Sequence, residues 1–142
     1  MIFTESIIDK KQAIIRIIDR IFLQDLPFFL SGDDVVPTKK IFQWIAENTG
    51  NLINIEAIAS LFHLSAKQIH RSIEFLRSSY LIYDVAPYFR DKSREYSSRS
   101  KLYLHDVSLL SYTRNIWDDT FMTDGKITET LVVHALEKTL RE

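Results

Sequence analysis

The 142-residue sequence predicts a mainly α-helical fold with one small β-hairpin: a winged helix-turn-helix flanked by N-terminal and C-terminal helices. Apolar residues recur at helical spacing over most of the chain, and two helix-start signals, at Asn54 and Ser65, lie on either side of a tight turn. Two β-branched and aromatic runs, Tyr80–Ala86 and Lys101–His105, follow these helices. We expect three segments: an N-terminal helical segment (1–36), a winged-helix domain (37–104) and C-terminal helices (105–142).

The first expected helix covers residues 5–24, where isoleucines and a phenylalanine line one face and charged residues line the other. We expect Pro27 to end this helix, and the run Ser31–Asp34 followed by Pro37 to form a loop. The apolar face fits either the seam of a coiled-coil dimer or packing within its own domain. Fewer than three full heptads favour the second interpretation.

Three further helices are expected before the hairpin. Thr38 is placed to cap the first, which runs to about Asn48 and stops at Gly50, and Asn54 is placed to cap the second. The third runs from Ser65 to about Ser79 and starts with the S-x-x-Q pattern of a capping box, completed by Gln68. Two short helices joined by a tight turn, after another helix, are typical of a helix-turn-helix.

Two more helices are expected at the C-terminal end. Asp106 is placed to cap a helix that runs to about Trp117, and a last helix is expected over residues 126–141. The inward face predicted for the last helix consists of Ile127, Leu131, Val132, Ala135, Leu136 and Leu140.

Several function classes are excluded or disfavoured by composition. The chain has no cysteine, which excludes disulfides, thiolate zinc sites and a cysteine nucleophile. Its three glycines lie far apart, so no Walker A loop or dinucleotide fingerprint is present. No histidine spacing fits a metal site, and no G-x-S-x-G elbow occurs. We therefore expect a protein that is not an enzyme and holds neither cofactor nor metal. Without a signal peptide or apolar span, we expect a cytoplasmic protein that binds no membrane.

The net charge of −1 conceals a basic region in residues 66–101, which carry eight basic and four acidic side chains, a net charge of +4. Helical periodicity points one group of polar residues away from the buried stripe of the third helix, as in a helix that enters the DNA major groove. A second group lies in and beside the connection between the strands, interleaved with aromatic residues. The candidate nucleic-acid-binding residues are Lys67, Gln68, His70, Arg71 and Arg77 on the helix, and Arg90, Lys92, Arg94, Arg99 and Lys101 in the hairpin.

Two simpler interpretations of these residues stay open. The helix residues also fit a solvated face of mixed charge, and the hairpin residues fit a loop that shields a sheet edge. Asp91 and Glu95 dilute the positive field. The composition favours weak, non-specific nucleic-acid binding, with a Kd on the order of 10⁻⁴–10⁻⁶ M, over sequence-specific reading.

Three stretches resemble the C-terminal region of prokaryotic AAA-type ATP-binding proteins: Tyr80–Phe89, Lys101–Leu110, and Gly125 with Glu129, Val132 and Leu136. In that family an ATPase core precedes a helical lid, a winged helix and a domain of uncharacterised function similar in fold to restriction-endonuclease-type nucleases. The resemblance implies that residues 1–36 are lid-like and that residues 105–142 begin the nuclease-like domain. Glu129 matches an acidic residue of the nuclease-like core, whose other metal ligands would lie beyond Glu142.

We therefore expect a non-catalytic C-terminal fragment of such an ATP-binding protein, whose winged helix binds DNA or a partner protein. One candidate for the partner protein is the parent's own ATPase domain. The alternative is a free-standing dimeric winged-helix transcriptional regulator, in which residues 5–24 form the dimer contact and paired helices read DNA half-sites. The oligomeric state stays open.

Overall fold

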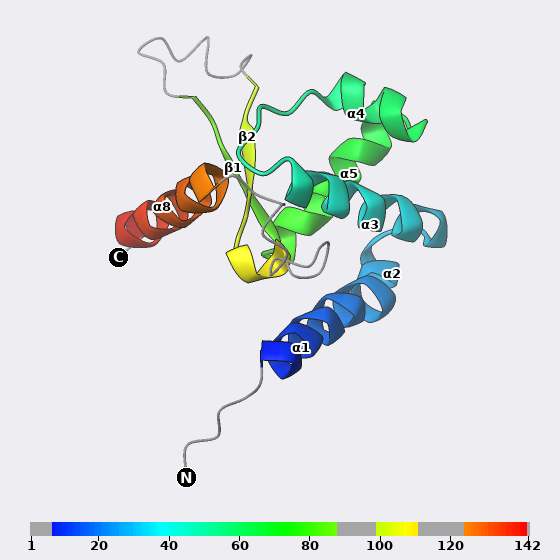
Figure 1. Ribbon diagram of the computed structural model, residues 1–142. Helices are drawn as coiled ribbons and strands as arrows, with labels where there is room; N and C mark the ends of the chain where they lie inside the picture. Colours follow the sequence, from blue (N-terminus) through cyan, green and yellow to red (C-terminus); the bar gives the residue numbers. More distant parts are fainter. Residues whose placement is uncertain (1–6, 88–98, 111–123, 142) are drawn as a thin grey trace.

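A computed structural model describes residues 7–87, 99–110 and 124–141. Within these ranges the fold is mainly helical and carries one two-stranded antiparallel hairpin, which confirms the prediction of a mainly α-helical fold with one small hairpin (Figure 1). None of the described helices is long and apolar enough to cross a membrane. In chain order, the elements are α1 (Ile7–Arg20), a π-helical turn η1 (Ile21–Asp25), α2 (Leu26–Phe29), α3 (Gly32–Glu47), α4 (Ile55–Phe62), α5 (Ala66–Ser78), β1 (Ile82–Val85), β2 (Lys101–Leu104), a 3₁₀ turn η2 (Val107–Leu109) and α8 (Asp124–Arg141).

The N-terminal helix continues through Pro27, contrary to the prediction that this proline ends it. In η1 the backbone N–H of Leu26 donates to the carbonyl of Ile21, five residues back. This wider turn precedes α2, in which Pro27 occupies the first turn, where proline is tolerated. Ile18, Phe22 and Leu26 recur every four residues through the junction and are all fully buried. The Phe22 ring packs on Phe42 of α3, with centroids 5.6 Å apart.

Helix α3 begins earlier than predicted, and the expected loop over Ser31–Asp34 is wrong. Ser31 occupies the N-cap position, and its hydroxyl donates to a carboxylate oxygen of Asp34 at 3.0 Å. Pro37 lies inside the helix. Thr38 is fully buried and forms a 2.8 Å hydrogen bond with the hydroxyl of Ser72, so it links two helices and does not cap one. The predicted segment boundary at residue 37 therefore falls within α3.

The start signals of α4 and α5 are confirmed. The side chain of Asn54 accepts from the backbone N–H of Ala57 at 3.2 Å. Ser65 and Gln68 form the complete capping box at the start of α5. Between the two helices, His63 has a left-handed backbone (φ 55°), and Leu64 N–H donates to the carbonyl of Ala59. This closes a tight turn, as predicted.

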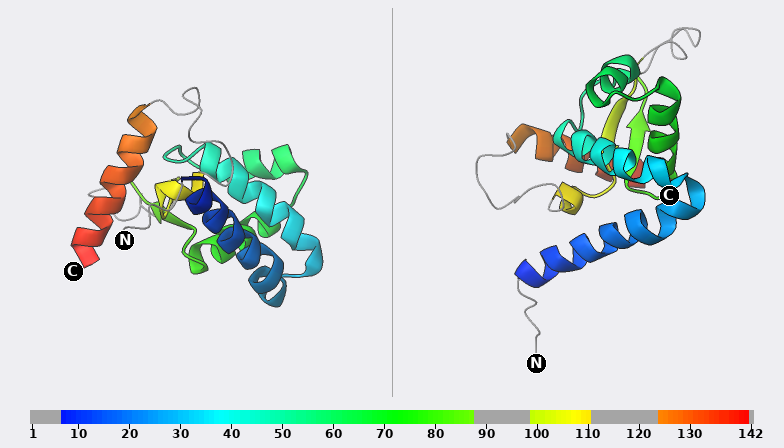
Figure 2. Two further views of the ribbon diagram at one scale, coloured as in Figure 1. Left: turned by 60° about the horizontal axis from the view of Figure 1, so that its bottom comes forward. Right: turned by 90° about the vertical axis from the view of Figure 1, so that its right-hand side faces the viewer.

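The hairpin has two covered faces. Side chains alternate between the faces of a strand, so Ile82 and Leu104 join the helical core, whereas Tyr83 and Tyr103 lie on the other face. These tyrosines are directly paired, and their rings stack with centroids 5.7 Å apart. Figures 1 and 2 show α8 beside the hairpin, separated by it from α3 and α5. The segment after α3 pairs with the free edge of β2 through a bridge between Leu52 and Lys101.

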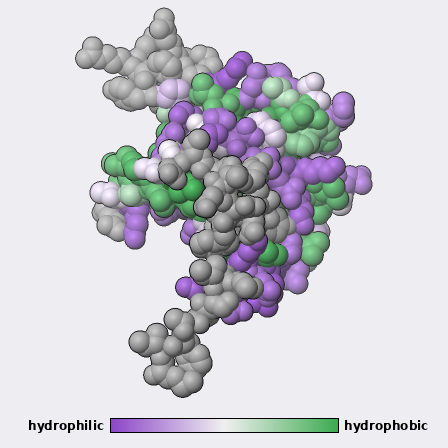
Figure 3. All heavy atoms as spheres, in the orientation of Figure 1, coloured by the Kyte–Doolittle hydropathy of each residue, from purple (hydrophilic) through white to green (hydrophobic). Residues whose placement is uncertain are grey.

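The predicted inward face of α8 is largely wrong. Leu131, Val132 and Leu136 are all more than half exposed, and Leu140 is 85% exposed. Figure 3 shows this apolar band on the surface. Thr130 is buried in their place. The predicted cap Asp106 does accept from Ser108 N–H at 2.7 Å, but it starts the short turn η2. The predicted continuation to Trp117 lies outside the described residues.

Candidate nucleic-acid interface

Helix α5 is held against α3 by apolar packing and by two polar contacts. Ile69 and Leu76 are fully buried in the core. Ser72 bonds to Thr38, and Arg71 donates to Asp34, with Nη2 to Oδ2 at 3.1 Å. These contacts fix which face of α5 points to solvent.

The carboxylate of Asp34 is the main polar anchor of this face. The residue is only 3% exposed, and its oxygens accept from Ser31, Arg71 and, at 3.4 Å, the side-chain amide of Gln68. A buried carboxylate is tolerated only when it is paired and hydrogen-bonded, and these three donors meet that need. Asp34 was not among the predicted site residues, although Ser31-x-x-Asp34 is itself a capping-box pattern.

The five predicted residues of α5 fall into two groups: three that are exposed near the start of the helix, and two that are committed to bonds with neighbouring side chains. Lys67 and His70 are exposed, and Arg71 keeps about half of its side chain in solvent despite its ion pair. Gln68 is committed to the capping box and to Asp34.

Arg77 belongs to the committed group. It binds Asp84 of β1 through Nε at 3.0 Å and Glu74 through Nη1 at 3.5 Å, so it links α5 to the hairpin. Arg77 keeps as much of its side chain in solvent as Arg71, but its charge is shared by two exposed or half-exposed carboxylates, so the positive charge of α5 is greatest in its first two turns.

The predicted hairpin residues are also divided. Arg99 is exposed and lines a cleft of about 590 Å³ between the start of α4, α5 and the hairpin, together with His70 of α5. Glu56 and Asp84 line the same cleft and lower its positive charge. Arg90, Lys92 and Arg94 lie outside the described residues.

Lys101 points to α8 and belongs to a small polar cluster there. Oε1 of Glu129 accepts from Lys101 Nζ at 3.0 Å and from the Tyr103 hydroxyl at 2.8 Å. These hydrogen bonds, first that from Tyr103 and then that from Lys101, lower the pKa of Glu129. The bond to Glu129 raises the pKa of Lys101, and burial together with the same carboxylate raises the pKa of Tyr103. The cluster attaches α8 to β2, so Lys101 and Glu129 have a structural use.

Within the described parts of the chain, no group of three or more histidine, aspartate or glutamate side chains is arranged to hold a metal ion. The site contains exposed cations at the start of α5 and just before β2, at the connected end of the hairpin, with a cleft between them. Such an arrangement offers charge to a phosphate backbone.

The structure thus defines a small, mainly helical domain with a two-stranded hairpin and a partly basic helix exposed beside it. Residues 2–120 match a family described as a domain of unknown function, DUF8612, and the chain belongs to that family. No curated protein and no solved structure has significant similarity to the chain. The resemblance to AAA-type ATP-binding proteins stays a prediction, since none of these comparisons bears on it.

Proposed function

We propose that this protein is a winged-helix module that binds nucleic acid weakly, through the first two turns of α5 and the connected end of the hairpin at Arg99. The order α3, α4, α5, β1, β2 supports a winged helix, as does the short pairing of residue 52 with β2. The observation that carries the proposal is the fixed, outward orientation of Lys67, His70 and Arg71 on a helix anchored by Asp34. Arg99 adds a cation across the neighbouring cleft.

The expected binding is non-specific. Few free cations are available on α5, and two acidic side chains, Glu56 and Asp84, lie in the cleft, so phosphate contacts dominate over reading of base edges. We expect a Kd on the order of 10⁻⁴–10⁻⁶ M that weakens steeply as salt rises, because each phosphate contact releases counterions.

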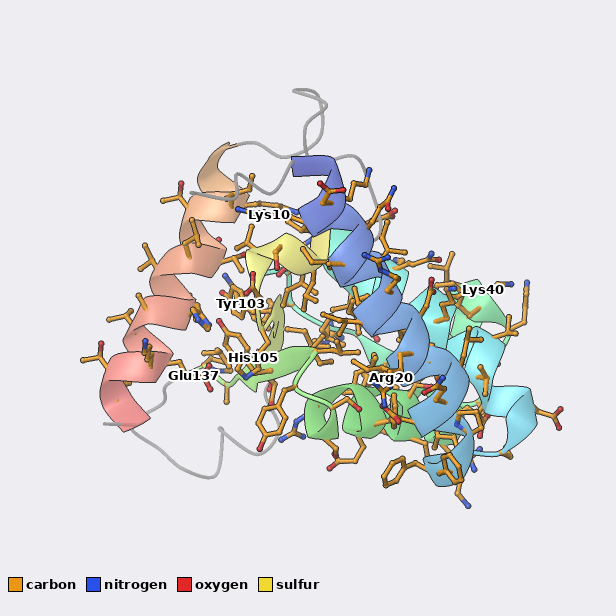
Figure 4. The ribbon with its side chains drawn as sticks, turned by 90° about the horizontal axis from the view of Figure 1, so that it is seen from below. Lys10, Arg20, Lys40, Tyr103, His105 and Glu137 are labelled. Carbon is orange, nitrogen blue, oxygen red and sulfur yellow. The ribbon has the colours of Figure 1, made fainter. Side chains whose placement is uncertain are left out.

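Fluorescence anisotropy with a labelled 20-base-pair duplex and a single strand, at 50 and 200 mM salt, tests the proposal. The double variant Lys67→Glu/Arg99→Glu should weaken binding at least about tenfold and flatten the salt dependence. Lys10→Glu/Arg16→Glu is the matched control, because it reverses the same number of charges on exposed residues of α1, at the end of the molecule away from the turn between α4 and α5 (Figures 1 and 4). Absence of a saturable signal, or equal losses in the double variant and the control, would rule out this surface.

A second candidate function is protein binding, favoured by apolar residues exposed on the N-terminal helix. Phe28 and Phe29 are 88% and 75% exposed, and Leu23 and Ile17 are more than half exposed. Large exposed apolar side chains mark interaction sites where they form a contiguous patch. Such a role fits both predicted settings: a fragment that packs on the ATPase domain of its parent, and a regulator that dimerises through its N-terminal helix.

Light scattering on the wild type and on Phe28→Ser/Leu23→Ser distinguishes the ATPase fragment from the dimeric regulator. A dimer that becomes monomeric in the variant supports the regulator. A wild-type monomer contradicts the dimeric regulator and leaves the fragment. Calorimetry with ATP and Mg²⁺ should show no binding by this chain, because it has no phosphate-binding loop.

A further inference from the structure

Tyr80 has a backbone conformation that its residue type disfavours. It directly follows the C-cap of α5 and has a positive φ of 55°. Its N–H donates to the carbonyl of Arg77, and the next N–H, that of Leu81, donates to Leu76. These two bonds form a Schellman motif, in which this position is usually glycine, since a side chain is strained there. The tyrosine side chain is nevertheless 70% exposed, so burial of its ring does not explain why it is there.

The ring of Tyr80 borders a cleft of about 310 Å³ at the edge of β1, enclosed by the end of α5 and by α8. Tyr80 and Tyr83 both meet the ring of His105, with centroids 5.7 and 5.5 Å away. Figure 4 shows His105, at the end of β2, beside Glu137 of α8. The three aromatic rings therefore form one wall of this cleft, which we call the Tyr80 cleft.

The charge of the Tyr80 cleft is negative. Among the residues that the structure describes, three carboxylates line it, those of Glu74, Asp84 and Glu137, together with the guanidinium of Arg77. The formal charges of these four side chains sum to −2. Arg77 already pairs with Glu74 and Asp84, and both pairs lie at the side of the cleft formed by α5 and β1. Glu137 approaches from the opposite side, on α8.

A buried polar group adds a second, independent observation. Tyr83 is only 8% exposed and lines the cleft, and its hydroxyl has no hydrogen-bond partner in the part of the chain that the structure describes. Most buried hydroxyls in native proteins are paired, and an unpaired one is explained by strain, by a functional role or by a bound water or ion. Strain at Tyr80 and an orphaned hydroxyl at Tyr83 therefore occur at the same acidic, aromatic cleft.

We propose that the Tyr80 cleft binds a guanidinium group carried on a short alkyl chain. Aromatic faces attract cations, and the flat guanidinium stacks on such rings while its N–H groups bond to carboxylates. The cleft lies at the lower limit of ligand-pocket volumes, so it admits one small molecule or one arginine side chain. This site adjoins the cleft of the proposed nucleic-acid surface, because Asp84 lines both, and it differs from that cleft in its wall formed by Tyr80, Tyr83 and His105.

Agmatine and the peptide acetyl-Ala-Arg-Ala-amide are the two probes, read by ¹H–¹⁵N NMR shifts of the uniformly labelled protein. We expect saturable shifts at residues 80–84, 105 and 137, with a Kd on the order of 1 mM. Tighter binding of agmatine assigns the ligand as a small molecule, and tighter binding of the peptide assigns it as an arginine side chain of a protein partner. The same peptide with citrulline, which is neutral and nearly isosteric, should bind at least tenfold more weakly.

Two variants test the residues named. Glu137→Gln removes the carboxylate on α8, and Tyr80→Gly removes the ring while relieving the left-handed backbone, so its Tm should not fall. Each should weaken binding about tenfold, whereas Glu56→Gln, which removes an exposed carboxylate outside the Tyr80 cleft, should leave it unchanged. Equal binding of the citrulline peptide, no saturable shift at 20 mM probe, or wild-type affinity in both cleft variants would overturn the proposal.

Discussion

Replacing the buried carboxylate of Asp34 is the most direct perturbation of the link between α3 and α5. Asp34→Ala removes an acceptor that serves three side chains: Ser31 at 3.0 Å, Arg71 at 3.1 Å and Gln68 at 3.4 Å. Asp34→Asn retains the shape and one acceptor oxygen but loses the charge. The exposed neighbour Asp33→Ala is the matched control, because it removes the same charge from the same helix turn.

The expected cost follows from these contacts. A hydrogen bond to a charged group contributes about 1.5–3 kcal/mol, and the Arg71 contact is discounted because that side chain is 46% exposed. Loss of the hydrogen bond from the Ser31 hydroxyl adds about 1 kcal/mol. We expect Asp34→Ala to lower the free energy of unfolding by about 2–3 kcal/mol and Asp34→Asn by about 1 kcal/mol. For a chain of this size, the alanine variant should lose roughly 6–12 °C in Tm.

Urea unfolding followed by circular dichroism measures these values, and a double-mutant cycle with Arg71→Ala isolates the ion pair. We expect the two single losses to be non-additive by at least about 0.5 kcal/mol. An Asp34→Ala loss no larger than that of Asp33→Ala, or strict additivity in the cycle, would refute the claim that this carboxylate anchors α5. Asp34→Asn should also free Arg71 and strengthen duplex binding in the anisotropy assay.

Three further predictions concern the hairpin and the helix packed on it. Tyr83→Phe should leave stability unchanged or raise it by up to about 1 kcal/mol, because the lost hydroxyl has no partner among the described residues, whereas Tyr103→Phe should destabilise. Burial raises the pKa of Tyr83 to about 12, so the stability that its neutral phenol contributes is complete below pH 10 and is lost between pH 10 and 12. Thermal unfolding at alkaline pH should show this loss in the wild type and not in Tyr83→Phe. Because the pKa of Glu129 is lowered, the stability that its carboxylate contributes is present above pH 4.5 and is lost as the pH falls further. Glu129→Gln should therefore lower the free energy of unfolding by less than about 1 kcal/mol at pH 7 and not at all at pH 2.5. An equal cost at both pH values would contradict the ion pair. Gly50→Ala should cost about 1–2 kcal/mol in urea unfolding, since φ is +78° and the new Cβ would lie 3.3 Å from the Tyr103 ring, while Gly32→Ala, with open space around it, should cost little.

Local signals in the sequence predicted the centre of this fold well. The Asn54 cap and the Ser65–Gln68 capping box join groups three residues apart, so the chain encodes them without reference to the rest of the fold. The strands were also found, because their composition differs from that of the helices around them.

The errors arose where a residue has two possible uses. Pro27 and Pro37 read as helix stops, but the first lies in the opening turn of α2, after a wide turn, and the second costs α3 only one backbone bond. Thr38 read as a cap, and its hydroxyl instead meets Ser72 across the core. For α8, an apolar pattern predicted the buried face, yet the helix docks through Glu129, which bonds to Tyr103 and Lys101.

The sequence predicted which residues belong to the candidate site, but it did not predict which of their charges are neutralised by ion pairs. Arg71 and Arg77 were correctly expected to leave the buried stripe of α5, and both are exposed. Their partners, Asp34 and Asp84, come from other elements, and no local pattern indicates such pairs. Net charge over a segment therefore overstated the positive surface that the folded chain offers.

Both faces of the hairpin are covered, and the element that covers the second face lies outside the part of the chain that matches the family. The sequence match stops at residue 120, before α8, yet α8 covers the tyrosine side of the strands through Glu129. A chain cut at that border would lose the partner of Tyr103 and uncover the stacked pair Tyr83–Tyr103. The end of the sequence match and the end of the packed unit therefore do not coincide. The smallest unit that covers both faces of the hairpin extends beyond the matched residues.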